Sequence, residues 1–190
     1  MKNLIYIVVF SLAMNPILSA QEIHSGFEID FGRTKMELAP KSYFSWRIGF
    51  TFSSSRAIYS IDYFNSKQPN RVQLLPRFLI FKGKNRIGNI NLMYGRNLLR
   101  PGNLGIFLSS GVSFISGTYE IGEETASNPY TYEKEEVRFT TVGLPLKLHL
   151  RYRVIDGFGV GFSLFGNINS KNKYWGREAA IYIGGVFSEK

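Results

Sequence analysis

The chain has 190 residues, a length that suits a single domain. Its content of 44% apolar and 19% charged residues excludes a disordered chain, and the absence of cysteine excludes disulfides, thiol catalysis and Cys-based zinc sites. The formal net charge is +9, and two histidines, His24 and His149, are too few for a multi-histidine metal site. We therefore expect no metal and no cofactor.

The N-terminal residues have the pattern of a secretory signal peptide. Lys2 gives a positive start, residues 4–14 form an apolar core, and Leu18-Ser19-Ala20 precedes polar residues. The apolar core is shorter than the roughly 20 residues of a membrane-spanning helix. We expect residues 1–20 to be a signal peptide, cleaved after Ala20, and residues 21–190 to be one exported domain.

The rest of the chain alternates between apolar and polar residues, which is the pattern of strands with two different faces. Phe44 and Trp46, for example, alternate with Ser45 and Arg47. The pattern predicts eight strands, at 26–33, 43–53, 57–65, 87–97, 104–119, 135–154, 157–168 and 178–187.

The predicted connections alternate in length along the chain. Three are short turns, at 53–56, 98–103 and 155–156, and four are longer, at 34–42, 66–86, 120–134 and 169–177. Short turns at one end, long loops at the other and an even number of strands are typical of outer-membrane barrels. Residues 72–81 are apolar enough for a ninth strand, but the resulting odd number, Pro76 and imperfect alternation favour a loop.

The composition of the polar faces indicates which side of the predicted barrel is wet. A soluble barrel keeps its apolar face inside, and its outer surface is about 25–35% charged. The polar faces of strands 104–119 and 157–168 carry Gly, Ser and Asn without charge, which suits the crowded interior of an eight-stranded barrel. Large aromatic residues near the strand ends would form interfacial girdles. These are Phe27, Phe44, Phe52, Tyr59, Tyr152, Phe158 and Phe187.

We therefore predict an all-β protein, a closed eight-stranded antiparallel up-and-down transmembrane β-barrel. The first and last strands must pair, because an open edge in lipid would leave backbone groups unsatisfied. Pro145 lies inside strand 135–154, and the apolar residues change from odd positions, such as Phe139, to even positions from Val142 onward. This predicts a β-bulge at Thr140 to Gly143.

Charged residues on the polar faces are expected to point into the lumen. We predict that they form a packed ionic network with a structural role. The predicted network is Glu28, Asp30, Arg47, Asp62, Lys147, His149, Arg151 and Arg153. The alternative is a narrow path for ions or small solutes through the same residues, although eight strands leave little room for a pore. Arg151 rather than Ser follows His149 on its face, so no catalytic residue and no enzyme are predicted.

Four C-terminal motifs support the barrel prediction: Thr141–Leu146 (TVGLPL), Gly157–Gly161 (GFGVG), Gly166–Ser170 (GNINS) and Ile183–Phe187 (IGGVF). They resemble the small outer-membrane β-barrel domain proteins of Gram-negative bacteria, the OmpA/OmpX-like barrels. The resemblance implies a location in the outer membrane and a structural, adhesive or interaction role without catalysis. The end of the chain departs from the pattern, because Ser188-Glu189-Lys190 follow Phe187 where the family often finishes on an aromatic residue.

Two predicted loops carry opposite charge. Segment 66–86 is basic and has no acidic residue, whereas segment 120–136 has six glutamates and one lysine, Lys134. Such runs are often only solvated. The functional alternative is that the basic loop contacts anionic lipopolysaccharide head groups, while the acidic loop pairs with it or binds divalent cations. The contact residues would be Lys67, Arg71, Lys82, Lys84 and Arg86.

The leading prediction is a monomeric, non-enzymatic outer-membrane protein whose partners are outer-membrane lipid and lipopolysaccharide. A surface protein partner is not identified by the sequence, and export makes nucleic acid an unexpected partner. Two alternatives stay open: a narrow channel, and a soluble exported barrel that binds an apolar ligand.

Overall fold

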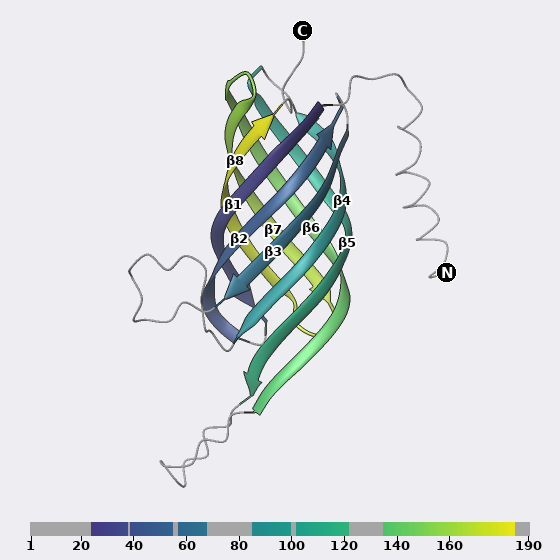
Figure 1. The fold of residues 1–190 in the computed structure, drawn as a ribbon, viewed down its shortest axis with the longest axis vertical. Coiled ribbons are helices and arrows are strands. Elements are labelled where there is room, and N and C mark those ends of the chain that lie inside the picture. Colours follow the sequence, from purple (N-terminus) through teal and green to yellow (C-terminus); the bar gives the residue numbers. More distant parts are fainter. Residues whose placement is uncertain are drawn as a thin grey trace, which may run out of the picture.

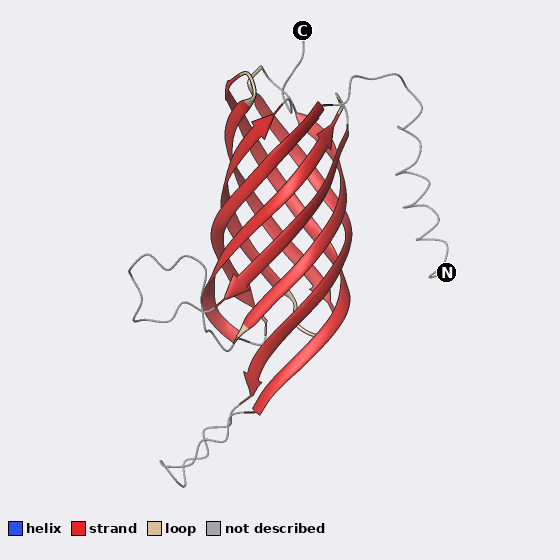
Figure 2. Ribbon diagram, viewed as in Figure 1, coloured by secondary structure: helices blue, strands red, loops and turns tan. Residues whose placement is uncertain are grey.

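The computed structural model describes residues 24–37, 39–54, 57–67, 85–99, 102–121 and 135–184. They form eight strands: β1 (His24–Met36), β2 (Ala39–Ser53), β3 (Ala57–Lys67), β4 (Arg86–Leu99), β5 (Leu104–Ile121), β6 (Glu135–Ile155), β7 (Phe158–Asn169) and β8 (Tyr174–Gly184). Each strand pairs with the next, and β8 closes on β1 (Figures 1 and 2). The predicted closed antiparallel barrel is confirmed. The expected signal peptide and residues 72–81 lie outside the described residues.

The ends of four strands extend further than the sequence pattern indicated. Segments 34–42 and 169–177 are not long loops, because β1 and β2 reach Met36 and Ala39, and only residues 170–173 separate β7 from β8. Their polar ends lack apolar alternation, but the backbone ladder continues, with Arg33 opposite Arg177. Backbone pairing does not require apolar side chains, so a hydropathy pattern ends before the strand does.

The predicted β-bulge at Thr140 to Gly143 is wrong. β5 and β6 keep one register from Leu104↔Tyr152 to Ile121↔Glu135, interrupted only opposite Leu144 and Pro145, where proline offers no N–H. Phe139 is buried in the lumen, so the change in apolar parity marks a place where the interior becomes apolar. The register of β6 shifts instead against β7, between Arg153 and Ile155.

The outer wall of the barrel is apolar and the middle of the lumen is polar. On β6, Leu144, Leu146, Leu148 and Leu150 are 39% to 46% exposed, whereas Lys147 between them is 1% exposed. An apolar exterior around a polar lumen is the arrangement of a transmembrane barrel. The alternative of a soluble barrel with an apolar interior does not fit this arrangement. The described residues also contain no helix that is long and apolar enough to cross a membrane.

The height of the apolar wall matches a membrane. On β4 the outward positions run from Arg86 through Ile90 and Leu92 to Arg96, so a cation stands at each end of the apolar stretch. Ten strand residues tilted by about 40° rise roughly 26 Å, close to the ≈25 Å apolar band of outer-membrane barrels. The described aromatic residues predicted for the girdles lie on outward positions of their strands, namely Phe27, Phe44, Phe52, Tyr59, Tyr152 and Phe158, and Phe187 lies outside the described residues.

Candidate functional site

The middle of the lumen contains a cluster of charged side chains from five strands. Each of them is at most 5% exposed. This lumen cluster consists of Glu28, Asp30, Arg47, Asp62, Lys147, His149, Arg151 and Glu178. The alternation of each strand directs these residues inward, because the intervening positions face outward and, apart from Arg177, are apolar. Four carboxylates therefore face three permanent cations and one histidine.

The carboxylates of β1 are held by cations of β6. Lys147 Nζ lies 2.5 Å from Asp30 Oδ2 and also donates to Glu28 Oε1. Arg151 Nη2 donates to Glu28 Oε2 at 2.7 Å. His149 Nδ1 lies 3.8 Å from Glu28 Oε1. Since β1 and β6 are not neighbours in the barrel, these contacts cross the lumen.

Arg47 on β2 contacts carboxylates of three other strands, β8, β3 and β1. Its Nε donates to Glu178 Oε2 and its Nη1 to Asp62 Oδ1, both at 3.1 Å, and Nε lies 3.5 Å from Asp30 Oδ2. Its guanidinium carbon also lies 5.1 Å and 4.9 Å from the ring centroids of Phe64 and Phe165. Arg47 therefore stands at the boundary between the lumen cluster and an aromatic layer.

That aromatic layer lies in the lumen at the end from which the longer connections leave. We call it the apolar plug, and it consists of Met36, Tyr43, Phe64, Ile87, Ile115, Phe139, Phe165 and Tyr174. The rings of Phe64 and Tyr174 are stacked with centroids 5.4 Å apart, and Phe165 contacts Phe64 edge-on at 5.2 Å. The plug and the lumen cluster occupy two successive levels of the interior, and Phe107 and Tyr182 lie on the other side of the cluster, against Arg151.

Two differences separate this arrangement from the predicted network. Arg153 does not join the lumen cluster, because it lies at the register shift near the β6–β7 turn, where it contacts Asp156 at 3.6 Å and Asn103 at 3.0 Å. Glu178 belongs to the cluster and is absent from the prediction. The sequence did contain a signal for Glu178. The apolar face of its predicted strand begins at Ala179, so the even-numbered Glu178 falls on the opposite, inward face.

His149, the histidine of the lumen cluster, is buried beside a serine. His149 stands opposite Ser163 in the β6–β7 ladder. The two ring nitrogens of His149 and the Oγ atom of Ser163 have no hydrogen-bond partner there. Both residues are at most 2% exposed, so a substrate has no access to them. No three His, Asp or Glu side chains of the described part are placed to hold a metal ion.

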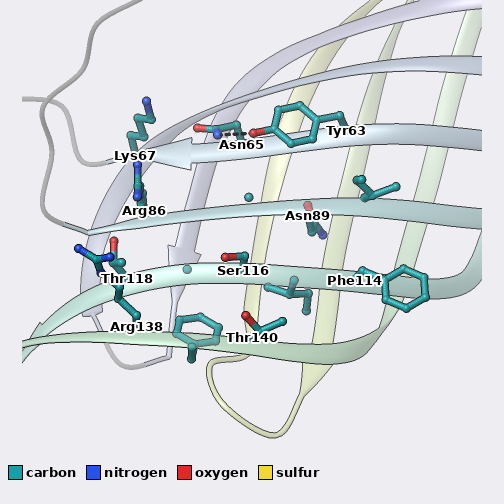
Figure 3. Close-up of a pocket in the computed structure, with 15 residues that line it drawn as sticks. Tyr63, Asn65, Lys67, Arg86, Asn89, Phe114, Ser116, Thr118, Arg138 and Thr140 are labelled. Carbon is teal, nitrogen blue, oxygen red and sulfur yellow. Dashed lines mark hydrogen bonds between the residues drawn. The ribbon is translucent and has the colours of Figure 1, made fainter.

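A second feature lies on the outer wall, near the longer connections. A groove of about 790 Å³ crosses β3, β4, β5 and β6 (Figure 3). Lys67, Arg86 and Arg138 lie at one end of it, and Phe114 lies toward the other end. Two of the predicted lipopolysaccharide contacts, Lys67 and Arg86, therefore share this groove. The other three, Arg71, Lys82 and Lys84, lie outside the described residues.

The sequence matches no family model and no curated protein sequence, but the fold matches solved structures. Neisserial surface protein A superposes with a TM-score of 0.58 at 11% identity, over 85% of this chain and 96% of that chain. Ail, the attachment invasion locus protein of Yersinia pestis, gives 0.55 at 7% identity over 87% and 99% of the two chains. Ail in complex with the heparin analogue sucrose octasulfate gives 0.57 at 8% identity over 86% and 99%.

The chain has the fold of small outer-membrane barrels. The resemblance that the C-terminal motifs indicated is confirmed at this level. At sequence identities of 7% to 11%, these structural matches show the fold alone, because one fold can carry many functions.

Proposed function

We propose that this protein is an integral outer-membrane barrel, exported by a cleaved signal peptide, that has no enzymatic activity and acts in surface interactions or adhesion through its long-loop end. The lumen cluster and the apolar plug support a structural role for the interior. The carboxylates there are paired with cations, and the buried apolar plug lies at one end of the lumen. This arrangement leaves the exposed end as the part available for partners.

The observation that carries the interaction role is the β5–β6 hairpin, which extends beyond the rest of the barrel (Figure 1). The pairing of β6 with β7 stops at Gly143↔Asn169, whereas its pairing with β5 continues to Ile121↔Glu135. Within the described residues, the β7-side edge of β6 from Glu135 to Val142 has no partner strand. Such an edge offers backbone N–H and C=O groups to an extended segment of another protein.

The membrane part of the proposal is tested by cell fractionation and by comparing unboiled and boiled samples on an SDS gel. A membrane barrel is expected to partition with the outer membrane and to migrate as a compact species before boiling. A protein that remains in the soluble fraction contradicts the proposal.

The interaction role is tested by shortening the hairpin. Thr118 and Arg138 face each other across the ladder, so residues 119–137 are replaced by a two-residue Asn-Gly turn that joins them. Bacteria that display the full chain are expected to adhere to cultured epithelial cells more than cells with the empty vector, and the shortened variant is expected to return to that background. Unchanged adherence of a shortened, heat-modifiable variant contradicts a role for the hairpin.

A further inference from the structure

Three outward-facing cations form one row across strands β3 to β6 of the barrel wall. Lys67 on β3 is paired directly with Arg86 on β4, Arg86 with Thr118 on β5, and Thr118 with Arg138 on β6. Neighbouring strands lie about 4.8 Å apart, so Arg86 and Arg138 are separated by roughly 10 Å of sheet. Among the side chains that the structure describes, no carboxylate lies within 4.0 Å of the side-chain nitrogens of Lys67 or Arg86.

The third cation has an exposed partner. Arg138 Nε lies 3.4 Å from Glu136 Oε1, and the two side chains are 79% and 48% exposed. An ion pair with this exposure contributes little free energy, because water already solvates both charges. Arg138 therefore retains the capacity to bind a second anion.

Below the cations the wall is hollowed by small outward-facing residues. Gly88, Ser116 and Thr140 line the groove on three successive strands. Tyr63 lies over Gly88, where a Cβ atom would stand 3.3 Å from the Tyr63 hydroxyl, and Asn65 Nδ2 donates to that hydroxyl at 3.0 Å. The groove therefore combines polar hydrogen-bonding groups with open space.

Further from the cations the groove meets the apolar wall. Ile90 and Phe114 line it and are 49% and 55% exposed, on the part of the wall that faces acyl chains. From one end to the other, the groove thus presents cations, then small and polar groups, then apolar side chains (Figure 3). A phosphorylated glycolipid has the same order, with phosphate, sugar and acyl chain.

We infer that this groove binds one lipopolysaccharide molecule through a phosphate of its lipid anchor. Lys67, Arg86 and Arg138 hold the phosphate, the floor of Gly88, Ser116 and Thr140 accommodates the sugar, and the acyl chains lie on Ile90 and Phe114. Charge-assisted hydrogen bonds to phosphate are among the strongest polar contacts available at this level of the wall. The inference rests on the proposed outer-membrane location and specifies the lipid partner there.

The test is a native mass spectrometry titration of the refolded full mature chain in detergent with purified lipid A. The wild-type barrel is expected to bind one lipid A per barrel, with an affinity about tenfold higher than for dephosphorylated lipid A or phosphatidylglycerol. The double variant Lys67→Gln with Arg86→Gln is expected to lose about tenfold in affinity. The variant Ser116→Phe fills the groove, leaves all cations in place and is expected to weaken binding to a similar extent.

The chain offers a matched control on the opposite wall. Arg33 on β1 and Arg177 on β8 are also a directly paired, exposed couple of cations. Arg33→Gln with Arg177→Gln removes the same charge and therefore lowers the general electrostatic attraction to the lipid by the same amount. Because these two residues lie outside the groove, the control is expected to change the affinity by less than about twofold. An equal loss in the two double variants, or equal binding of phosphatidylglycerol, overturns the groove assignment.

The outcomes also separate this inference from the proposed function. A wild-type chain that fractionates with the outer membrane and is heat-modifiable, but binds no lipid A, overturns the groove assignment alone. A chain that remains soluble overturns the proposed function. If Lys67→Gln with Arg86→Gln does not fold, Arg138→Gln and Ser116→Phe provide the same comparison, and unchanged affinity in both overturns the assignment.

Discussion

Lys147 on β6 reaches across the lumen to Asp30 on β1, with Nζ 2.5 Å from Oδ2, and the same ammonium contacts Glu28. One side chain therefore holds two carboxylates on the opposite wall. Buried charges are tolerated when each has a partner, and removal of one partner leaves the others uncompensated. The lumen cluster should for this reason respond strongly to the loss of a single member.

The substitution Lys147→Met is expected to destabilise the barrel by about 3–5 kcal/mol, because Glu28 and Asp30 lose their shared cation in a buried site. Urea unfolding in lipid vesicles, followed by tryptophan fluorescence, measures the change. Lys173→Met is the control, since the Lys173–Glu37 pair is exposed on both sides and contributes at most about 1 kcal/mol. Adding Asp30→Asn to Lys147→Met is expected to restore part of the loss, because it removes one charge of each sign and leaves Glu28 paired with Arg151. Equal stability of Lys147→Met and Lys173→Met would contradict the role of the pair.

The substitution Arg47→Lys is expected to cost about 1.5–3 kcal/mol although it keeps the charge. A single ammonium cannot reproduce the planar guanidinium that contacts Asp62 and Glu178 and lies against Phe165. Arg138→Lys is the matched control on the exposed surface, with an expected change within about 0.5 kcal/mol. The same urea titration compares the two variants, and wild-type stability of Arg47→Lys would show that geometry at this position is unimportant.

The orientation toward lipid is tested with two arginine substitutions on one strand. Leu148 lies in the middle of the outward apolar run of β6, and Leu148→Arg is expected to cost about 2–4 kcal/mol in a bilayer. Thr140 faces outward near the cations, and Thr140→Arg is expected to cost at most about 1 kcal/mol. Equal tolerance of both substitutions in vesicles would indicate that the apolar wall does not contact lipid.

The filled lumen is expected to conduct no ions. The apolar plug and the lumen cluster occupy successive levels of the interior, and their side chains are largely buried. Purified protein in planar bilayers is therefore expected to give no steady conductance steps. Reproducible steps that disappear in Arg47→Gln or Arg151→Gln would support the channel alternative instead.

The alternation of residues predicted most of the barrel because each strand position has only two directions in which to point. The strands around Phe44 and Leu148 lie where their apolar parity indicated, and the inward direction of Lys147 followed from it. The same reasoning failed for Phe139, where an inward apolar residue was read as a slip in register. Parity gives a direction, but it does not state whether the interior at that level is polar or apolar.

The sequence by itself determined the strand number, the closed barrel and the lipid-facing wall, because these depend on local alternation and on the need to satisfy every backbone group in lipid. Only the tertiary structure decided which charges meet. The contact of Arg47 with Glu178 joins residues 131 positions apart, and the row of Lys67, Arg86 and Arg138 arises from the register of four strands. Barrel closure and register set such distances, and no local pattern in the sequence encodes them.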